Sequence, residues 1–293
     1  LAYAGQQSGQ QVAVYLREGT YYLSTTIVLN AADFSTASLL IQPYRQEQVT
    51  ISAGRRLSLK WEPYRDGIYM AKIPAGTSFE RLYVNDTLQV LARYPNYDSA
   101  ARVFHGTAAD AIAPQRVKRW KHPEGGYVHA LHAYEWGGFH YRITGADSNG
   151  NLQLEGGWQN NRPNKMHKEY RFVENIFEEL DTAGEWYLDK NNSILYYYPP
   201  SPARLDQAVI EASDLKNSIE LRGTSGAPLK HITLSGLRFA HNERTFMDTR
   251  EPLLRSDWTI YRGGAVLMDG TESCKIDDCV FEGIGGNAIM LSN

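Results

Sequence analysis

The sequence predicts an all-β protein: a right-handed parallel β-helix, that is, a solenoid of stacked coils, interrupted by an inserted antiparallel β domain. The first observation is a repeat, in which Val266–Asp269 matches Ile289–Ser292 at a spacing of 23 residues (289 − 266). Such a period is typical of one solenoid coil. The second observation is that the repeat disappears in the middle of the chain. Because one coil cannot bury its own apolar row, the repeated segments should stack on one another.

The first segment, residues 1–60, is predicted to form the first coils. Short apolar runs such as Val12–Leu16 and Leu39–Ile41 alternate in the manner of strands and are separated by turn residues, with no helical period. The opening residues, Leu1–Ala4, resemble the tail of a longer apolar segment, and Met290–Asn293 stop inside a coil. We therefore expect an N-terminal fragment of a longer protein.

The second segment, residues 61–200, is predicted to be the inserted antiparallel β domain. Turn residues at Gly145–Gly150 and at Lys190–Asn192 lie between apolar runs and predict two hairpins. The run Val128–Ile143 is rich in Trp, Tyr and His. One short helix is expected at Phe172–Leu180.

The third segment, residues 201–293, is predicted to resume the β-helix. Ile232–Phe239 matches Cys274–Phe281 at a spacing of 42 (281 − 239). This spacing is longer than the 23 residues of one coil, so we expect a loop to extend from one of the coils. That loop is Asn242–Arg262, which has no repeat character, and long loops in compact domains tend to be functional or disordered.

The two cysteines are predicted to be free thiols in the solenoid core. Cys274 and Cys279 occupy the positions that Ile232 and Leu237 hold in the matching repeat. An apolar position favours packing over a disulfide or a metal site.

Composition excludes several classes of function. The net charge of −3 over 293 residues gives no general attraction to nucleic acid or to anionic membranes. No apolar run approaches the length of a membrane span. We expect no cofactor and no nucleic-acid partner; the sequence leaves the oligomeric state open.

Several segments together resemble the right-handed parallel β-helix glycoside hydrolases. Their positions match the opening coil, the start and end of the inserted domain, and a later coil: Val12–Leu23, Leu82–Asn85, Ala92–Asn96, Phe172–Asp189 and Gly285–Ile289. The sequence is most similar to glycoside hydrolase family 141, with the family 120 β-xylosidases as relatives. The resemblance implies a bacterial glycosidase that is secreted, periplasmic or at the cell surface and acts on a complex polysaccharide or oligosaccharide. It also implies catalytic acids on middle coils, which we expect mainly after Asn293.

Glycoside hydrolysis needs two carboxyl groups that flank the scissile bond. Adjacent coils are about 4.8 Å apart, a spacing that could bring two such groups together. Among the residues present, Asp257 is the first candidate for a catalytic role and Asp269 the second. Asp277 and Asp278 fit turn positions better.

Substrate contacts are predicted from two parts of the chain. The long loop and its start offer His241, Glu243 and Trp258, and the inserted domain offers Trp136, Trp158 and Arg162. Packing in a core remains an alternative for each Trp.

The spacing His129-x-x-His132-x-x-Glu135 could suggest a metal site. In a strand, however, residues three apart point to opposite faces, so no metal is predicted there.

Two other functions stay open at this point. A β-helix polysaccharide lyase would abstract a proton next to a uronate carboxylate, and it would usually require Ca²⁺ held by clustered acids, a pattern that the sequence lacks. A non-catalytic carbohydrate-binding or adhesive solenoid is the other alternative.

Overall fold

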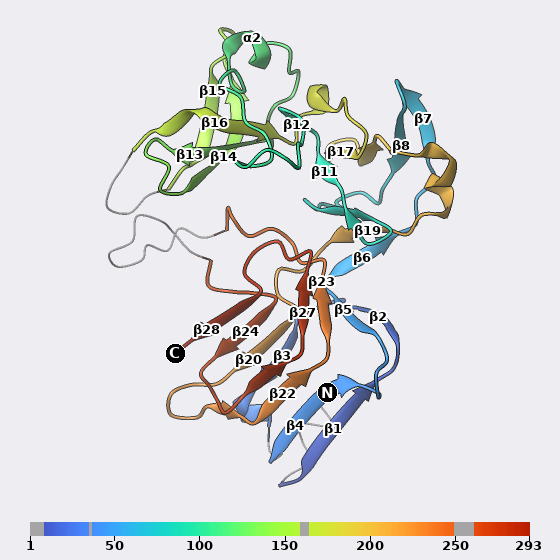
Figure 1. Cartoon of the computed structure of the whole chain (residues 1–293), viewed down its shortest axis with the longest axis vertical. Helices are drawn as coiled ribbons and strands as arrows, with labels where there is room; N and C mark the ends of the chain where they lie inside the picture. The colour runs from blue at the N-terminus through green and yellow to red at the C-terminus, as the bar shows by residue number, and fades with distance from the viewer. Residues whose placement is uncertain (1–8, 35–36, 159–163, 249–260) are drawn as a thin grey trace.

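The computed structural model describes residues 9–34, 37–158, 164–248 and 261–293 (Figure 1). Strands dominate these residues, as the sequence predicts. The helical segments within them are short: η1 (Ala31–Asp33), α2 (Pro114–Val117), η2 (Phe177–Glu179) and η3 (Pro202–Gln207). No helix in this part of the chain is long and apolar enough to cross a membrane.

Within the described residues, the lower part of Figure 1 holds three four-stranded parallel sheets, which we call the stack. The first sheet is β1 (Gln11–Leu16), β4 (Ser38–Pro43), β22 (Ile232–Ser235) and β26 (Lys275–Asp277). The second is β2 (Gly19–Tyr22), β5 (Val49–Ser52), β23 (Arg238–Ala240) and β27 (Val280–Glu282). The third is β3 (Ile27–Asn30), β20 (Ile219–Arg222), β24 (Val266–Asp269) and β28 (Ile289–Ser292). A short parallel pair, β21 (Leu229–Lys230) and β25 (Thr271–Glu272), lies beside them.

The strand pairing in the stack follows the sequence repeats. Val266 pairs with Ile289, as the 23-residue spacing predicts, and on its other side with Ile219. Leu234 pairs with Ile276, as the 42-residue spacing predicts. These predicted pairings are confirmed.

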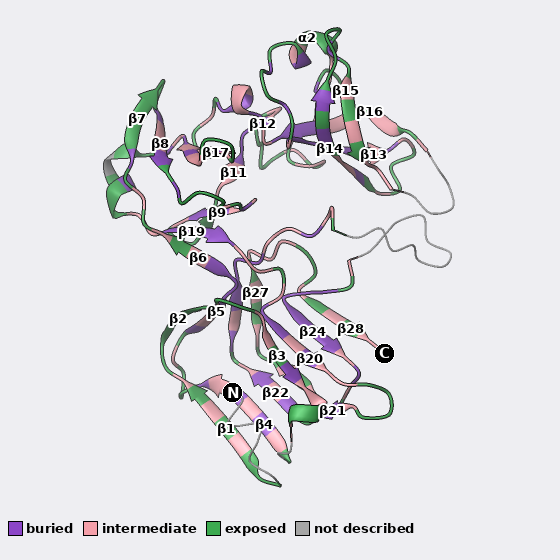
Figure 2. Cartoon of the chain, turned by 180° about the vertical axis from the view of Figure 1, so that it is seen from behind, coloured by how far each residue is buried: buried purple, intermediate pink, exposed green. Residues whose placement is uncertain are grey.

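The stack is continuous across a long insertion in the chain. Leu39 of β4 pairs directly with Ile232 of β22, although the residues between β5 and β20 lie in the other part of the molecule (Figure 1). The inward rows build one apolar core from aligned positions, for example the stacked rings of Phe239 and Phe281, whose centroids are 5.0 Å apart. Figure 2 shows that burial is greatest in the inner strands and least on the outer strands of the molecule, such as β7 (Glu62–Arg65).

The upper part contains three further sheets among the described residues, almost entirely antiparallel. The sheet nearest the stack is β10 (Thr87–Leu88), β9 (Leu82–Val84), β19 (Ile210–Ser213) and β6 (Gly54–Leu57). The next is β11 (Val90–Leu91), β17 (Glu185–Asp189), β18 (Ile194–Tyr197), β8 (Ile68–Lys72) and β7; here β11 and β17 are parallel. The last is β12 (Arg93–Tyr94), β16 (Met166–Glu174), β13 (Tyr127–His132), β14 (Gly138–Ala146) and β15 (Leu152–Gly156).

Two predicted hairpins are confirmed, and one predicted helix is present only in part. The turns at Gly145–Gly150 and Lys190–Asn192 join the antiparallel pairs β14–β15 and β17–β18. The segment Phe172–Leu180 begins with the end of strand β16 and contains only the three-residue 3-10 helix η2. The reason is tertiary: Phe172 and Val173 pair with β13, and pairing to a neighbouring strand overrides local preference.

Both cysteines are free thiols, as predicted. The register places Cys274 beside Ile232 and Cys279 beside Leu237. They are half-buried because β26 and β27 are the outermost strands of their sheets.

Candidate functional site

A cavity of about 210 Å³ lies at the junction between the stack and the antiparallel sheets; we call it the junction cavity. Its walls come from five separate parts of the chain, two of which are strand β14 with Arg142 and the segment after β19 with Lys216. The segment after β23 contributes Glu243, Arg244 and Phe246, strand β13 contributes Tyr127, and the segment before β9 contributes Glu80.

Glu243 is the carboxyl group best placed to hold a proton in this cavity. Its Oε2 accepts hydrogen bonds from the hydroxyl of Ser213 (2.8 Å) and the backbone N–H of Glu80 (3.0 Å), and its Oε1 accepts one from the N–H of Arg244 (2.7 Å). Burial raises the pKa of Glu243, and the negative charge of Glu80 raises it further, against the opposing effect of these hydrogen bonds. A carboxyl group of this kind can act as a general acid.

Glu80 lines the same cavity and is hydrogen-bonded to strand β13. The hydroxyl of Tyr127 donates a short hydrogen bond to Oε1 of Glu80. Burial, together with the charge of Glu80, raises the pKa of Tyr127, so the phenol stays protonated and remains the donor.

A buried ion pair holds Arg244 at the edge of the cavity. Its guanidinium contacts Oε1 of Glu174, and Nε2 of His129 lies 3.0 Å from the same oxygen. Burial alone would raise the pKa of Glu174, but the charge of Arg244 and the contact with His129 hold it well below its usual range. Burial and the neighbouring His129 lower the pKa of His140 to about 3, so His140 is neutral.

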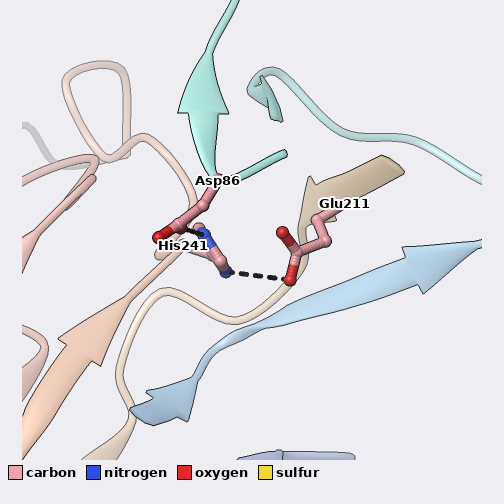
Figure 3. A group of neighbouring side chains, drawn as sticks. All are labelled: Asp86, Glu211 and His241. Carbon is pink, nitrogen blue, oxygen red and sulfur yellow. Dashed lines mark hydrogen bonds and ion pairs between the residues drawn. The ribbon is translucent and has the colours of Figure 1, made fainter. Parts of the chain in front are cut away.

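A second polar cluster lies where the β9–β10 turn meets the stack, and Figure 3 shows its three members. His241, which is 2% exposed, has Nε2 2.9 Å from Oδ1 of Asp86 and Nδ1 3.8 Å from Oε1 of Glu211. Nδ1 also lies 3.0 Å from the hydroxyl of Ser52. The hydroxyl of Tyr22 donates to Glu211 at 2.5 Å.

The three side chains in Figure 3 have the donor types of a metal site, with one atom of each within 4.8 Å of the others. Their contacts fit a structural cluster, which we call the relay, better: His241 is hydrogen-bonded to Asp86 and Ser52 and lies within ion-pair distance of Glu211. The two ring nitrogens of His241 face different carboxylates, those of Asp86 and Glu211. Asp86 is also ion-paired with Arg238, whose Nη2 lies 2.8 Å from Oδ2 of Asp86. The cluster therefore fastens the antiparallel part to the stack.

The structure brings one of the predicted site residues, Glu243, into the junction cavity. His241 lies two residues away but is buried in the relay. Asp269, at the end of β24, accepts a hydrogen bond from the amide of Asn293 (2.7 Å), lies 3.7 Å from the guanidinium of Arg222, and does not line the cavity.

The predicted aromatic contacts lie elsewhere in the antiparallel part. Trp136 is 59% exposed at the tip of the β13–β14 hairpin and stacks on His132, with centroids 5.2 Å apart. Trp158 is half-buried just after β15. Asp257, Trp258 and Arg162 lie outside the described residues.

Sequence reasoning missed Glu80, Tyr127 and Glu174. Tyr127 directly precedes the aromatic-rich run Val128–Ile143, which was the available signal. The spacing of His129 and His132 behaves as expected of a strand: His129 contacts Glu174, whereas His132 stacks on Trp136.

Comparison with solved structures identifies a shared fold. A chain titled "Glycoside hydrolase" superposes with a TM-score of 0.74 over 95% of this chain, at 19% sequence identity. This chain spans 56% of the length of that structure. A second chain, titled "The complex structure of XylC with xylose", has a TM-score of 0.37 and 13% identity, covering 96% of this chain and 38% of the other. No protein-family model and no curated protein matches the sequence.

Proposed function

We propose that the protein is a glycoside hydrolase that acts on a complex polysaccharide or oligosaccharide. The observation that carries the proposal is the junction cavity. In it, Glu243, whose pKa is raised, lies beside Glu80, whose carboxylate accepts a hydrogen bond from Tyr127. The fold shared with a solved structure named glycoside hydrolase supports it.

The proposal includes the finer architecture. Three parallel sheets with aligned inward rows support a right-handed parallel β-helix interrupted by an antiparallel domain. The antiparallel domain extends beyond the expected bounds of 61–200, because β6 pairs with β19 and β19 pairs with β9, rather than with the stack. Membership near families 141 and 120, and a secreted, periplasmic or cell-surface location, rest on the sequence resemblance.

In the proposed chemistry, Glu243 donates a proton to the leaving glycosidic oxygen, and Glu80 with Tyr127 orients the sugar in the cavity. Hydrolysis also requires a second catalytic carboxylate on the opposite side of the bond. The acids expected after Asn293 are the candidates for that role, and Asp257 remains a prediction. The ion-paired position of Asp269 gives it less support than Glu243 has.

The experiment is a screen of aryl glycosides and polysaccharides with the whole protein, followed by Glu243→Gln on the substrate found. Gln keeps the acceptor for Ser213 but cannot donate the acidic proton, so kcat/KM should fall by about 10²–10⁴-fold. The matched control is Glu272→Gln on the stack, an exposed residue paired with Lys230, which should stay within about twofold.

The pH profile is a second readout of the same role. Glu243 must be protonated to act as the acid, so activity should fall as the pH rises through its raised pKa. The Glu243→Gln variant should not show this fall in activity at high pH. Lack of turnover on every substrate, or an unchanged profile in the variant, would reject the proposal.

A further inference from the structure

A second, larger cavity lies on the antiparallel part, and we call it the distal cavity. Its volume is about 790 Å³, within the range of roughly 300–1,000 Å³ found for small-ligand sites. One wall is the loop after β12, with Asn96, Asp98 and Arg102; the opposite wall is the sheet, with Leu131 and Tyr170.

The distal cavity is separate from the junction cavity. Tyr127 lines the junction cavity and Leu131 lines the distal cavity, and both residues belong to β13. In a strand, residues four positions apart point to the same face, and their Cα atoms are about 13 Å apart. His129, which lies between them on that face, is 3% exposed and packs against Phe172. A buried layer thus divides the two cavities.

The loop wall of the distal cavity is held in place by one buried arginine. Arg93, which is 4% exposed, donates hydrogen bonds to the carbonyl oxygens of Pro95 (2.8 Å), Phe104 (3.0 Å) and Gly106 (2.7 Å). Its guanidinium also lies over the ring of Phe172, 4.0 Å from the centroid. A wall fixed in this way loses little conformational entropy when a ligand binds.

The lining chemistry matches a neutral sugar. Leu131 and the ring of Tyr170, one face of which stacks on His167, offer apolar surface for the C–H face of a pyranose ring. The amide nitrogen of Asn96 already donates to Asp181 and Thr182, so the amide oxygen of Asn96 and the carboxylate of Asp98 are the acceptors for its hydroxyl groups. Tyr97, next to the lining residues, is 45% exposed and stacks on His105 with centroids 4.6 Å apart.

Charge separates neutral from acidic sugars. The lining carries two carboxylates, Asp98 and Glu135, against one guanidinium, Arg102. This negative balance repels uronates and sulfated sugars, and it leaves Arg102 to donate hydrogen bonds to hydroxyl oxygens.

We propose that the distal cavity is a binding site for a neutral oligosaccharide, distinct from the site of hydrolysis. Its role is to hold a glycan on the protein through the loop after β12 and the face of β13 and β16. Binding there requires no bond cleavage, so the inference stands apart from the proposed hydrolytic function.

The test is titration calorimetry of Glu243→Gln protein with cellohexaose, xylohexaose and mannohexaose, with trigalacturonic acid as the charged control. The Glu243→Gln background suppresses turnover. We expect at least one neutral hexasaccharide to bind and trigalacturonic acid to bind at least about tenfold more weakly, a difference of about 1.4 kcal/mol.

Variants then assign that binding to the distal cavity. Tyr170→Ala and Arg102→Ala should weaken it at least about tenfold, whereas the matched controls Tyr15→Ala and Arg65→Ala, both at exposed positions remote from the cavity lining, should stay within about twofold. Tyr170→Phe, which keeps the ring, should retain most of the binding, and thermal melting checks that each variant is folded.

Three results would overturn the inference: no binding of any neutral hexasaccharide, equal binding of trigalacturonic acid, or unchanged binding in both Tyr170→Ala and Arg102→Ala. Failure of the hydrolytic proposal has a different signature. In that case no glycoside is cleaved by the unmodified protein, while the hexasaccharide still binds and still depends on Tyr170.

Discussion

The stack and the antiparallel part bury different kinds of side chain. The core of the stack is a set of aligned Leu, Ile, Val and Phe residues. Among the described residues, the buried Arg, His and Glu side chains lie in the antiparallel part or at its junction with the stack: Arg93, His129, His132, Glu174, Glu179, Glu185, Glu211 and His241. Repetition provides an apolar scaffold, and the interruption of the repeat provides the groups that can do chemistry.

The largest loss of stability is expected from a substitution that breaks the buried ion pair at the junction. Arg244→Met removes the partner of Glu174 and leaves a buried carboxylate without its main counter-charge, which should destabilise the protein by about 3–5 kcal/mol. Urea unfolding measures it. The control is Arg222→Met, which removes a partly exposed pair with Glu220 and should cost about 1 kcal/mol or less. Equal effects in the two variants would contradict the contrast between the two regions.

The next largest loss of stability is expected from a substitution that creates a cavity in the core of the stack. Leu234 is fully buried in β22, so Leu234→Ala should destabilise the protein by about 3 kcal/mol through lost burial and the cavity that remains. The loss should be the same at pH 5 and pH 8, because the core around it is apolar. Leu88→Ala, at a position that is 47% exposed, serves as the control and should change little.

A pH-dependent effect is expected in the antiparallel part. Burial raises the pKa of Glu185 from 4.5 to about 8, opposed by hydrogen bonds from the N–H groups of Asp181 and Thr182. The folded protein therefore holds this proton more tightly than the unfolded chain does, so the contribution of Glu185 to stability is greatest below pH 4.5 and is lost as the pH rises toward 8.

Glu185→Gln should remove this dependence. Between pH 5 and pH 7 the unmodified protein should lose about 2–3 kcal/mol relative to the variant, since one pKa unit corresponds to about 1.4 kcal/mol. Parallel urea titrations at both pH values provide the measurement. If the two proteins show the same pH dependence, Glu185 is not protonated in the folded state.

The smallest effect concerns the thiols of the stack. Burial raises the pKa of both Cys274 and Cys279, so their reaction with a disulfide reagent at pH 8 should be at least about tenfold slower in the folded protein than in urea. Two thiols should be counted in urea without a reductant. A count of none would mean a disulfide.

Some features of the fold were predictable because they are local or repetitive. The pairing of Val266 with Ile289 follows from a spacing within one chain, and the cysteine positions follow from the same alignment. The hairpins follow from turn residues between apolar runs. The helix predicted at Phe172–Leu180 forms only at Phe177–Glu179, because nothing in that short segment reveals that β13 lies beside its first residues.

The sequence by itself determined the all-β class, the aligned apolar rows and the place where the repeat stops, because each is encoded in the order and spacing of nearby residues. Only the tertiary structure decided which side chains meet at the junction. Glu80, Tyr127 and Glu243 come from distant parts of the chain and share one cavity because the insertion folds back onto the end of β23. The raised pKa of Glu243 has the same origin: desolvation depends on what surrounds a carboxyl group, and its surroundings exist only after the two regions have packed together.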